Sequence, residues 1–229
     1  MKPPSIYEFG GREDVVRRVQ TPLATHFRGH SPVLDIGCGR GIFLQILMAA
    51  GIDAIGLDHS DEAVASCREK GFQVHCEDAH IYLTRNEQRF GGIFCSQVIE
   101  HLDYEDALAL LKLCHAALRP DGVLLLVTPN PLDLSIISEI FWLDPTHVRP
   151  YPGALLKSML ESVGLQPTIE RYFLGDWRLV GRKNLLAYFF RRMLLGRYYG
   201  KPNTMILARK STPAIPAKNN GQPSSSAVR

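Results

Sequence analysis

The chain has 229 residues, 45% of them hydrophobic, so it is long enough for one domain with its own core and some additions. It has no run of about 18 apolar residues and no short apolar stretch behind a charged start, so neither a membrane-spanning helix nor a signal peptide is predicted. Five cysteines without the paired spacing of metal sites predict reduced thiols in a cytoplasmic protein.

The net charge of +3 hides two oppositely charged parts of the chain. Residues 1–170 hold 14 Lys/Arg against 22 Asp/Glu, whereas residues 171–210 hold 10 Lys/Arg against the single acid Asp176. This basic stretch favours an anionic partner near the C-terminal part.

The first half of the chain reads as a helical cap followed by alternating strands and helices. Charged and apolar residues on opposite sides predict a helix over 11–28, within an N-terminal cap spanning 1–30. Apolar runs predict strands at 32–36, 53–57, 73–76, 92–96 and 122–128. Helical spacing predicts helices at 41–50, 60–70, 79–88 and 103–118. The alternation is typical of a three-layer α/β/α fold, a mostly parallel sheet with helices on both faces, which binds ligands at the carboxyl ends of its strands.

The pattern weakens after residue 128, although one domain is expected over 31–210. A helix and two further strands are predicted, in order, at 155–164, 166–173 and 204–209. Residues 171–201 form a basic, aromatic-rich segment of this domain. Residues 211–229 are polar and aperiodic, which predicts a disordered tail.

The stretch "VLDIGCGRGIF" (33–43) places three alternate glycines, Gly37, Gly39 and Gly41, between a strand and a helix. Because glycine lacks a Cβ, the backbone can turn tightly and approach a ligand at the start of the helix. The dinucleotide fingerprint expects a further glycine where Ile42 stands, which argues against a nicotinamide cofactor.

Acidic residues follow the next two strands. Asp58 ends "IGLD", where a carboxylate can accept both hydroxyls of a ribose, and Asp78 lies in "HCEDAH", where an acid can accept from an adenine amino group. Each acid taken alone is equally well explained as a helix N-cap. Their coincidence with the glycine loop at three consecutive strand ends favours a nucleoside ligand.

These motifs resemble those of the class I S-adenosylmethionine-dependent methyltransferases. "VLDIGCGRG", "GLDHS", "CEDAH", "GGIFCSQVIEHL" and "LRPDGVLLLVTPNP" occur in the order and spacing of that family between about residues 31 and 130. The resemblance implies a seven-stranded sheet whose last strand is antiparallel, with S-adenosylmethionine as cofactor. It also implies a set of cofactor-binding residues: Asp35, Gly37, Cys38, Gly39, Asp58, His59, Asp78, Ala79, Gln97 and Val98. Within that set, Gly37 and Gly39 would face the methionine part and Asp35 its ammonium, Asp58 the ribose, and Asp78 with Ala79 the adenine.

The stretch "CSQVIEHL" (95–102) ends the fourth strand beside the expected sulfonium. Glu100 is a candidate acceptor-binding residue, and His101 is either a general base or a residue that caps a helix. Quinone-biosynthesis O-methyltransferases have a similar stretch with acids at the places of Gln97 and Glu100, and it carries a metal. Because Gln97 is uncharged, no metal site is predicted here.

The stretch "WLDPTHVRPY" (142–151) predicts a loop after the fifth strand, because two prolines within ten residues suit neither helix nor strand. His147 is the preferred catalytic base, and Arg149 is a candidate clamp for a phosphate or carboxylate. The alternative is an ordered loop in which Asp144 caps a turn and His147 bonds to the backbone.

"SQVIEHL" and "DPTHVRPY", together with "YEFGGREDVVRRVQ", narrow the resemblance to bacterial methyltransferases of cell-surface polysaccharide assembly. We therefore expect O-methylation of a hydroxyl or phosphate on a glycan precursor. Two alternatives stay open: O-methylation of a small hydroxylated metabolite such as a quinone precursor, and a cofactor-binding partner without turnover.

Residues 177–201 mix Arg and Lys with large apolar side chains, and their 184–195 core predicts a helix. One interpretation is a helix packed on the sheet with its basic residues in water. The other is a peripheral membrane contact, with anionic lipid or a lipid-linked acceptor. Nucleic acid is an unlikely partner because no recognised nucleic-acid module accompanies the charge.

Overall fold

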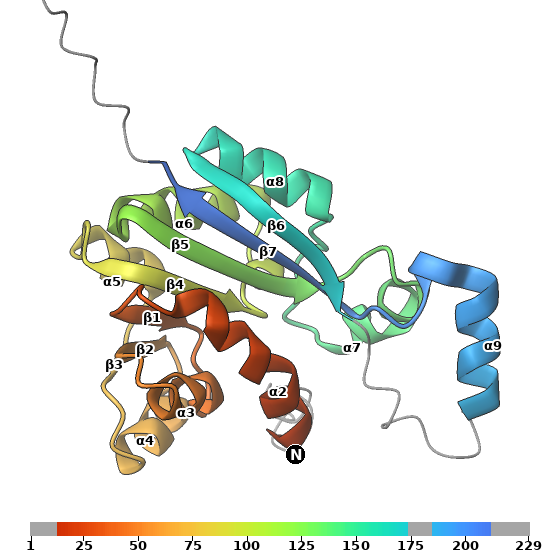
Figure 1. The fold of residues 1–229 in the computed structure, drawn as a ribbon, viewed down its shortest axis with the longest axis horizontal. Coiled ribbons are helices and arrows are strands. Elements are labelled where there is room, and N and C mark those ends of the chain that lie inside the picture. The colour runs from red at the N-terminus through yellow and green to blue at the C-terminus, as the bar shows by residue number, and fades with distance from the viewer. Residues whose placement is uncertain (1–12, 174–184, 212–229) are drawn as a thin grey trace, which may run out of the picture.

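The computed structural model describes residues 13–173 and 185–211. One sheet of seven strands runs through the molecule (Figure 1). The strands are β1 (Val33–Ile36), β2 (Ala54–Asp58), β3 (Val74–Cys76), β4 (Phe90–Ser96), β5 (Leu118–Pro129), β6 (Leu165–Phe173) and β7 (Asn203–Lys210).

Helices connect these strands in the order that the alternation predicts. The α-helices are α2 (Glu13–Gln20), α3 (Ile42–Ala49), α4 (Asp61–Glu69), α5 (Ala79–Thr84), α6 (Tyr104–Ala117), α7 (Phe141–Leu143), α8 (Gly153–Ser162) and α9 (Leu185–Leu195). Shorter or non-α helical segments are η1 (Thr21–Phe27), η2 (Ile99–His101), η3 (Ile136–Ile140) and η6 (Gly196–Tyr198).

The strand order is β3-β2-β1-β4-β5-β7-β6, and β7 runs antiparallel to both of its neighbours. The predicted fold class, with a mostly parallel sheet and an antiparallel last strand, is therefore confirmed. Parallel register pairs Ile36 with Leu57 and with Cys95, and Ser96 with Val127. The residues that follow these pairs consequently meet along one edge of the sheet.

Alternate residues of each strand pack on opposite faces of the sheet. Leu34 and Ile36 face a core built with α5, α6 and α8, whereas Val33 and Phe94 face a second core built with η1 and α3. A smaller cluster packs α4 against β3 through Val64 and neighbouring residues. Helices therefore cover both faces, and the carboxyl edge of the strands stays available for a site.

Four local features differ from the sequence prediction. The helix expected over 11–28 breaks at residue 21, because Pro22 cannot donate and the Thr21 hydroxyl donates to the Arg17 carbonyl. Strand β5 begins at Leu118, before the strand predicted at 122–128, and residues 119–122 form a bulge in it because the register with β4 shifts there. Helix α5 ends early, where the Asn86 side chain donates to Tyr82 O. Segment η3 has no counterpart in the prediction.

Among the described residues, no helix combines the length and apolar character needed to span a membrane. The first 12 residues of the predicted cap, residues 174–184 of the basic segment and the predicted tail beyond residue 211 lie outside the described part of the chain.

Candidate functional site

The glycine loop between β1 and α3 has the left-handed backbone that its glycines permit. Gly37, Gly39 and Gly41 have φ values of +70°, +52° and +77°. A Cβ on Gly37 would lie 2.5 Å from Cγ2 of Val98, so this glycine allows the loops after β1 and β4 to touch. Two of the predicted cofactor-binding residues are thereby brought together.

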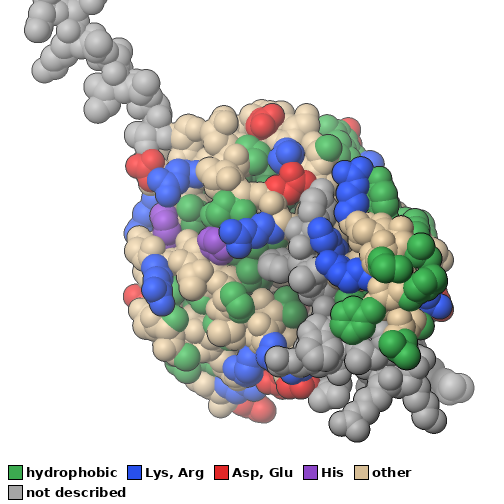
Figure 2. Space-filling model, turned by 45° about the vertical axis from the view of Figure 1, so that its right-hand side comes forward, with side chains coloured by type: hydrophobic (Ala, Val, Ile, Leu, Met, Phe, Trp, Pro, Cys, Tyr) green, Lys and Arg blue, Asp and Glu red, His purple; other side chains and the backbone are tan. Residues whose placement is uncertain are grey.

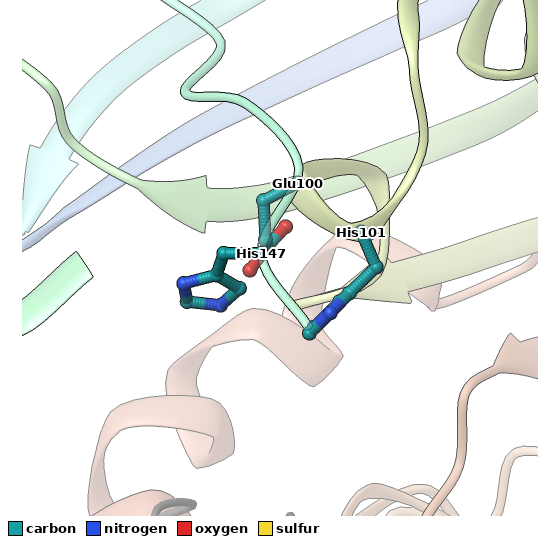
Figure 3. Close-up of side chains that lie close together, drawn as sticks. All are labelled: Glu100, His101 and His147. Atoms are coloured by element: carbon teal, nitrogen blue, oxygen red, sulfur yellow. The ribbon is translucent and has the colours of Figure 1, made fainter. Parts of the chain in front are cut away.

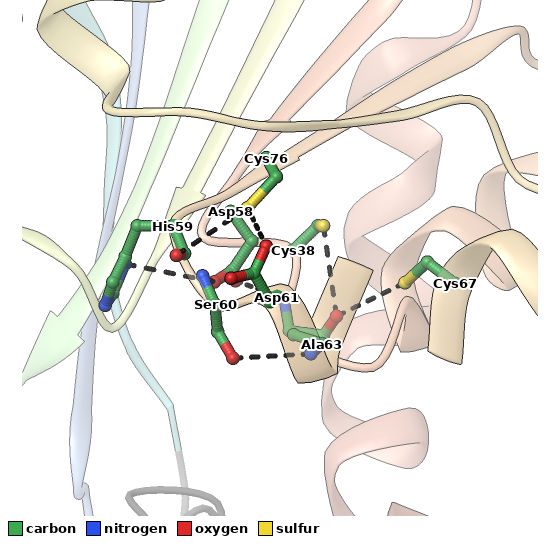
Figure 4. A network of polar contacts seen from close by, with 9 residues as sticks. Cys38, Asp58, His59, Ser60, Asp61, Ala63, Cys67 and Cys76 are labelled. Carbon is green, nitrogen blue, oxygen red and sulfur yellow. Dashed lines mark hydrogen bonds and ion pairs between the residues drawn. The ribbon is translucent and has the colours of Figure 1, made fainter. Parts of the chain in front are cut away.

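Asp58 is held at the carboxyl end of β2 by two backbone groups (Figure 4). Its Oδ2 accepts from Gly39 N at 2.8 Å and its Oδ1 from Ser60 N at 2.9 Å, and the side chain is only 6% exposed. Because each carboxylate oxygen can accept more than one hydrogen bond, capacity remains for two hydroxyl donors. The carboxylate thus joins the loops of β1 and β2 and suits the predicted ribose contact.

Asp78 has the helix-capping geometry that the sequence left as an alternative. Its Oδ1 accepts from His80 N and Ile81 N at the start of α5, while the side chain remains largely exposed. Ala79 begins that helix, and His59 projects from the loop after β2 with an exposed ring. Capping fixes the direction of Asp78, and an adenine contact from the same residue stays a prediction.

Asp35 is the most deeply buried acid of the predicted cofactor set. Its side chain lies in β1 beneath the glycine loop, and Oδ2 has no hydrogen-bond partner. Burial, with the nearby Cys67 thiol and Asp58, raises the pKa of Asp35 well above its usual range. An orphaned carboxylate oxygen next to bare backbone fits an ammonium group, which is what S-adenosylmethionine would offer there.

The contact of Cys38 with the cofactor stays a prediction. Its side chain is buried towards Cys67, and the Cys67 thiol, followed by burial, raises the pKa of the Cys38 thiol. Its backbone N–H donates to Leu57 O, and its carbonyl accepts from Gly41 N. The residue therefore stabilises the loop from within.

Gln97 and Val98 follow β4 directly. Gln97 has a φ of +56°, uncommon for a residue with a side chain, and its Nε2 donates to Asn203 Oδ1 at 3.1 Å. This bond links the end of β4 to the start of β7. Gln97 is exposed and Val98 half-buried, which is compatible with their place in the predicted cofactor-binding set.

His147 lies beside Glu100 and His101, although it is far from both in the sequence (Figure 3). The ligand atoms of the three side chains lie within 4.8 Å of one another, and the two imidazole centroids are 4.8 Å apart. Backbone bonds from Val148 N and Arg149 N to Glu100 O hold the 144–152 loop against η2. The two candidate bases, His101 and His147, therefore lie next to each other.

The Glu100 carboxyl has no exposed surface, and its Oε2 accepts from the Thr128 hydroxyl at 3.0 Å. Burial raises the pKa of Glu100 to about 8, although the Thr128 bond acts in the opposite direction. The carboxyl is enclosed, and its Oε1 has no hydrogen-bond partner among the described residues. The two imidazoles lie beside it, and its contact with the acceptor stays a prediction.

The hydrogen bonds of both histidines indicate which ring nitrogen carries the proton. His147 Nδ1 lies 2.6 Å from Phe141 O, and His101 Nδ1 lies 3.2 Å from Thr146 O. A carbonyl can only accept, so each Nδ1 is the donor in these contacts, and Nε2 of each neutral ring carries the lone pair. Nε2 of His147 lies 4.0 Å from Asp144 Oδ2. Burial, and then the neighbouring His147, lowers the pKa of His101, which favours its neutral form. His147 is half-buried, with 12% of its side chain exposed.

The structure also contains the contacts of the alternative hypothesis, in which residues 142–151 form an ordered loop. Thr146 donates from N and Oγ1 to Asp144 Oδ1, at 2.9 and 2.6 Å, so Asp144 caps the turn. The Arg149 guanidinium lies 5.1 Å from the Tyr151 ring centroid and 5.9 Å from that of Tyr104. This stacking holds Arg149 at the same loop, and its contact with an anionic acceptor remains a prediction.

The donor set at this place suits a magnesium ion poorly. Gln97, at the place of one acid, is turned to Asn203, and the Glu100 carboxyl is enclosed. One carboxylate and two imidazoles are ligands that transition metals prefer, whereas magnesium prefers oxygen ligands throughout. The residues therefore do not fit a magnesium site, and independence from metal remains our prediction.

Sequence reasoning missed the residues that hold this cluster in place. Thr128 could have been noticed, because a hydroxyl that ends a buried apolar strand needs a partner. Asn203 and Phe141 act through a side-chain amide and a backbone carbonyl contributed by distant segments. No local sequence pattern indicates such contacts.

Comparison with known proteins gives a consistent picture. Residues 10–169 match the family model described as "Methyltransferase domain". The crystal structure of a SAM dependent methyltransferase from Archaeoglobus fulgidus superposes with a TM-score of 0.77 at 29% identity, over 89% of this chain and 96% of that one. An S-adenosylmethionine dependent methyltransferase from Mesorhizobium loti, at 18% identity and a TM-score of 0.63, shares the fold over 88% of this chain and 99% of its own.

The chain is also similar in sequence to the ubiquinone biosynthesis O-methyltransferases. It is 34% identical to that of Haemophilus ducreyi over 108 residues, which are 43% of this chain and 45% of that protein. It is 33% identical to that of Coxiella burnetii over 104 residues, or 43% of each chain. The chain thus matches less than half the length of these curated relatives.

Proposed function

Because the chain belongs to the S-adenosylmethionine-dependent methyltransferase family, we propose that it transfers a methyl group to a hydroxyl oxygen, with His147 as the base. The observation that carries this proposal is the His147 imidazole, whose Nδ1 proton is fixed on Phe141 O. Its Nε2, 4.0 Å from Asp144 Oδ2, would then carry the lone pair that takes the acceptor proton. A neutral imidazole can accept a hydroxyl proton.

The residues of the chain would have two roles: most bind the cofactor, and one removes the proton of the acceptor hydroxyl. Asp58 would accept the ribose hydroxyls and Asp35 the ammonium, while Gly37 and Val98 shape the wall between them. Bound S-adenosylmethionine supplies the electrophilic methyl carbon. His147 would take the acceptor proton at Nε2, and His101 with Glu100 would keep its ring in place. Positioning in this way provides much of the catalysis in a displacement reaction.

For the acceptor, we propose a small hydroxylated molecule of the quinone-precursor kind. The support is the similarity to the ubiquinone biosynthesis O-methyltransferases of Haemophilus ducreyi and Coxiella burnetii. The surface-glycan precursor favoured by the sequence motifs is the second candidate. It is supported by Arg149 at the same loop as His147, which suits an acceptor with a phosphate or carboxylate.

The experiment supplies S-adenosylmethionine with a deuterated methyl group to the purified protein. A catechol-type acceptor and a phosphorylated sugar acceptor are tested in parallel, and products are identified by mass spectrometry. We expect a gain of one CD3 group on the catechol-type hydroxyl. Labelling of the sugar alone would replace the first candidate with the second. Cofactor binding without labelling of any acceptor would favour a partner protein without turnover.

A further inference from the structure

Helix α9 carries its apolar stripe on the side that faces solvent. Leu186, Phe189, Phe190, Met193 and Leu194 follow the i, i+3, i+4, i+7, i+8 spacing that places them on one face. All five are exposed, from 50% for Phe189 to 86% for Leu186. The helix stands out from the sheet (Figure 1). The interpretation of α9 as a helix packed on the sheet by its apolar face is therefore wrong.

The other face of α9 holds the helix to the following segment. Arg192 Nη1 donates to Tyr199 O at 3.2 Å, and the Tyr188 ring lies 5.7 Å from the Tyr199 ring. These residues lie opposite the apolar stripe on the helix circumference. The outward direction of the stripe is therefore fixed by contacts.

A second exposed apolar group lies on the segment that is bonded to Lys201 and Pro202, a few residues after α9. It consists of Leu132, Leu134, Ile140, Trp142 and Leu143. Lys201 N donates to Asp133 Oδ2, Asn130 Nδ2 to Lys201 O, and Asn130 N to Pro202 O, so the two segments are tied together. Figure 2 shows hydrophobic and basic side chains gathered on this side of the molecule.

The charge of this region indicates what it contacts. Residues 185–201 include Arg191, Arg192, Arg197 and Lys201 and no acid. We propose that the α9 stripe, together with the exposed apolar residues of 132–143, docks on the surface of an anionic phospholipid bilayer. Apolar side chains would enter the boundary between headgroups and acyl chains, and the basic ones would remain at the phosphate level.

Docking through this surface would bring the membrane close to the candidate site around Gln97 and His147. The chain runs from Lys201 and Pro202 into Asn203, whose side chain accepts from Gln97 at the end of β4. Segment 132–143 leads directly into the loop that carries His147. An acceptor with an apolar tail could therefore stay in the bilayer while its hydroxyl reaches His147. This last step rests on the proposed function, whereas lipid docking does not.

The test is co-sedimentation of the full chain, without cofactor or acceptor, with phosphatidylcholine vesicles that contain or lack phosphatidylglycerol. We expect strong binding only to the anionic vesicles, weakening with salt. The double variant Leu186→Ser/Phe190→Ser should bind at least about tenfold more weakly. Arg191→Gln should reduce binding about fivefold.

Met48→Ser is the matched control, since Met48 on α3 is 62% exposed and lies outside the proposed surface. It should bind vesicles like the unmodified chain, and circular dichroism should show the same helical content for every variant. Unchanged sedimentation of the double variant, or equal binding to vesicles without phosphatidylglycerol, would overturn the proposal. The proposal would also be overturned if the chain bound neither kind of vesicle but formed dimers that the double variant abolished. The apolar stripe would then join two copies of the chain. A failure of methyl transfer would leave the sedimentation result untouched.

Discussion

Two regions meet at the carboxyl edge of the sheet, and they hold their polar groups in different ways. At β1, β2 and β3, each candidate residue ends a strand or follows it closely, so register alone brings Gly37, Asp58 and Asp78 to one edge. At the ends of β4 and β5, Glu100 and His147 meet through hydrogen bonds between an irregular loop and η2. The first region is set by the repeat of the fold and the second by individual contacts.

This difference indicates which region suits cofactor binding and which suits proton transfer. Regular strand ends suit recognition of a cofactor, because their geometry survives changes elsewhere. The loop region holds a buried carboxyl, two imidazoles and an arginine stacked on tyrosines, so single substitutions should change its chemistry more than its cofactor affinity. The predictions below test that separation.

The largest effect is expected from His147→Ala in the loop region. Loss of a general base should lower kcat by about 100-fold or more, while the Kd for S-adenosylmethionine stays within about twofold. Turnover and calorimetric titration measure the two quantities. His115→Ala, in α6, is the control. Full turnover together with full cofactor binding in His147→Ala would end its assignment as the base.

Glu100→Gln should change how stability depends on pH. Because the folded protein raises the pKa of Glu100 to about 8 from the ordinary 4.5, it holds a proton that the unfolded chain releases. The protonated Glu100 carboxyl therefore contributes fully to the free energy of unfolding below pH 4.5, and this contribution is lost as the pH rises through 8. The loss is on the order of a few kcal/mol. Urea unfolding between pH 5 and 9 should show a smaller decline for the variant. Parallel curves for both proteins would contradict the assignment.

Asp35→Asn should weaken S-adenosylmethionine binding by about tenfold, because the ammonium loses a buried carboxylate. Burial raises the pKa of Asp35, and a cation favours the ionised form, so cofactor binding to the unmodified chain should weaken as the pH falls. The variant should lack this contribution to the pH dependence. Titrations from pH 6 to 9 measure both effects, and identical pH profiles would remove Asp35 from the site.

The smallest effect is expected from a chelator. Since Gln97 takes the place of an acid and Glu100 is enclosed, EDTA should leave turnover unchanged. The control is addition of Mg²⁺ after dialysis, which should also have no effect. Loss of activity with EDTA and its return with Mg²⁺ would contradict the prediction that turnover is independent of metal.

Sequence reasoning could predict the first region better than the second for a physical reason. Asp58 follows an apolar run and Gly37 precedes a helix, so both can be placed from the chain pattern alone. The burial of Glu100 depends on Thr128 and on the backbone of a loop whose path no periodicity specifies. The spacing of Leu186 and Phe190 likewise predicts an amphipathic helix, but only tertiary contacts decide that this face points outwards.

Calorimetric titration of S-adenosylmethionine into Asp58→Ala tests most directly whether the ends of β1, β2 and β3 form the cofactor site. The matched control is Asp53→Ala, since Asp53 is an exposed acid just before the opposite end of β2. We predict that Asp58→Ala loses about 1–3 kcal/mol of binding free energy, because two hydroxyls lose a charged acceptor. Asp53→Ala should bind like the unmodified chain. Unchanged affinity in a folded Asp58→Ala variant would contradict the account.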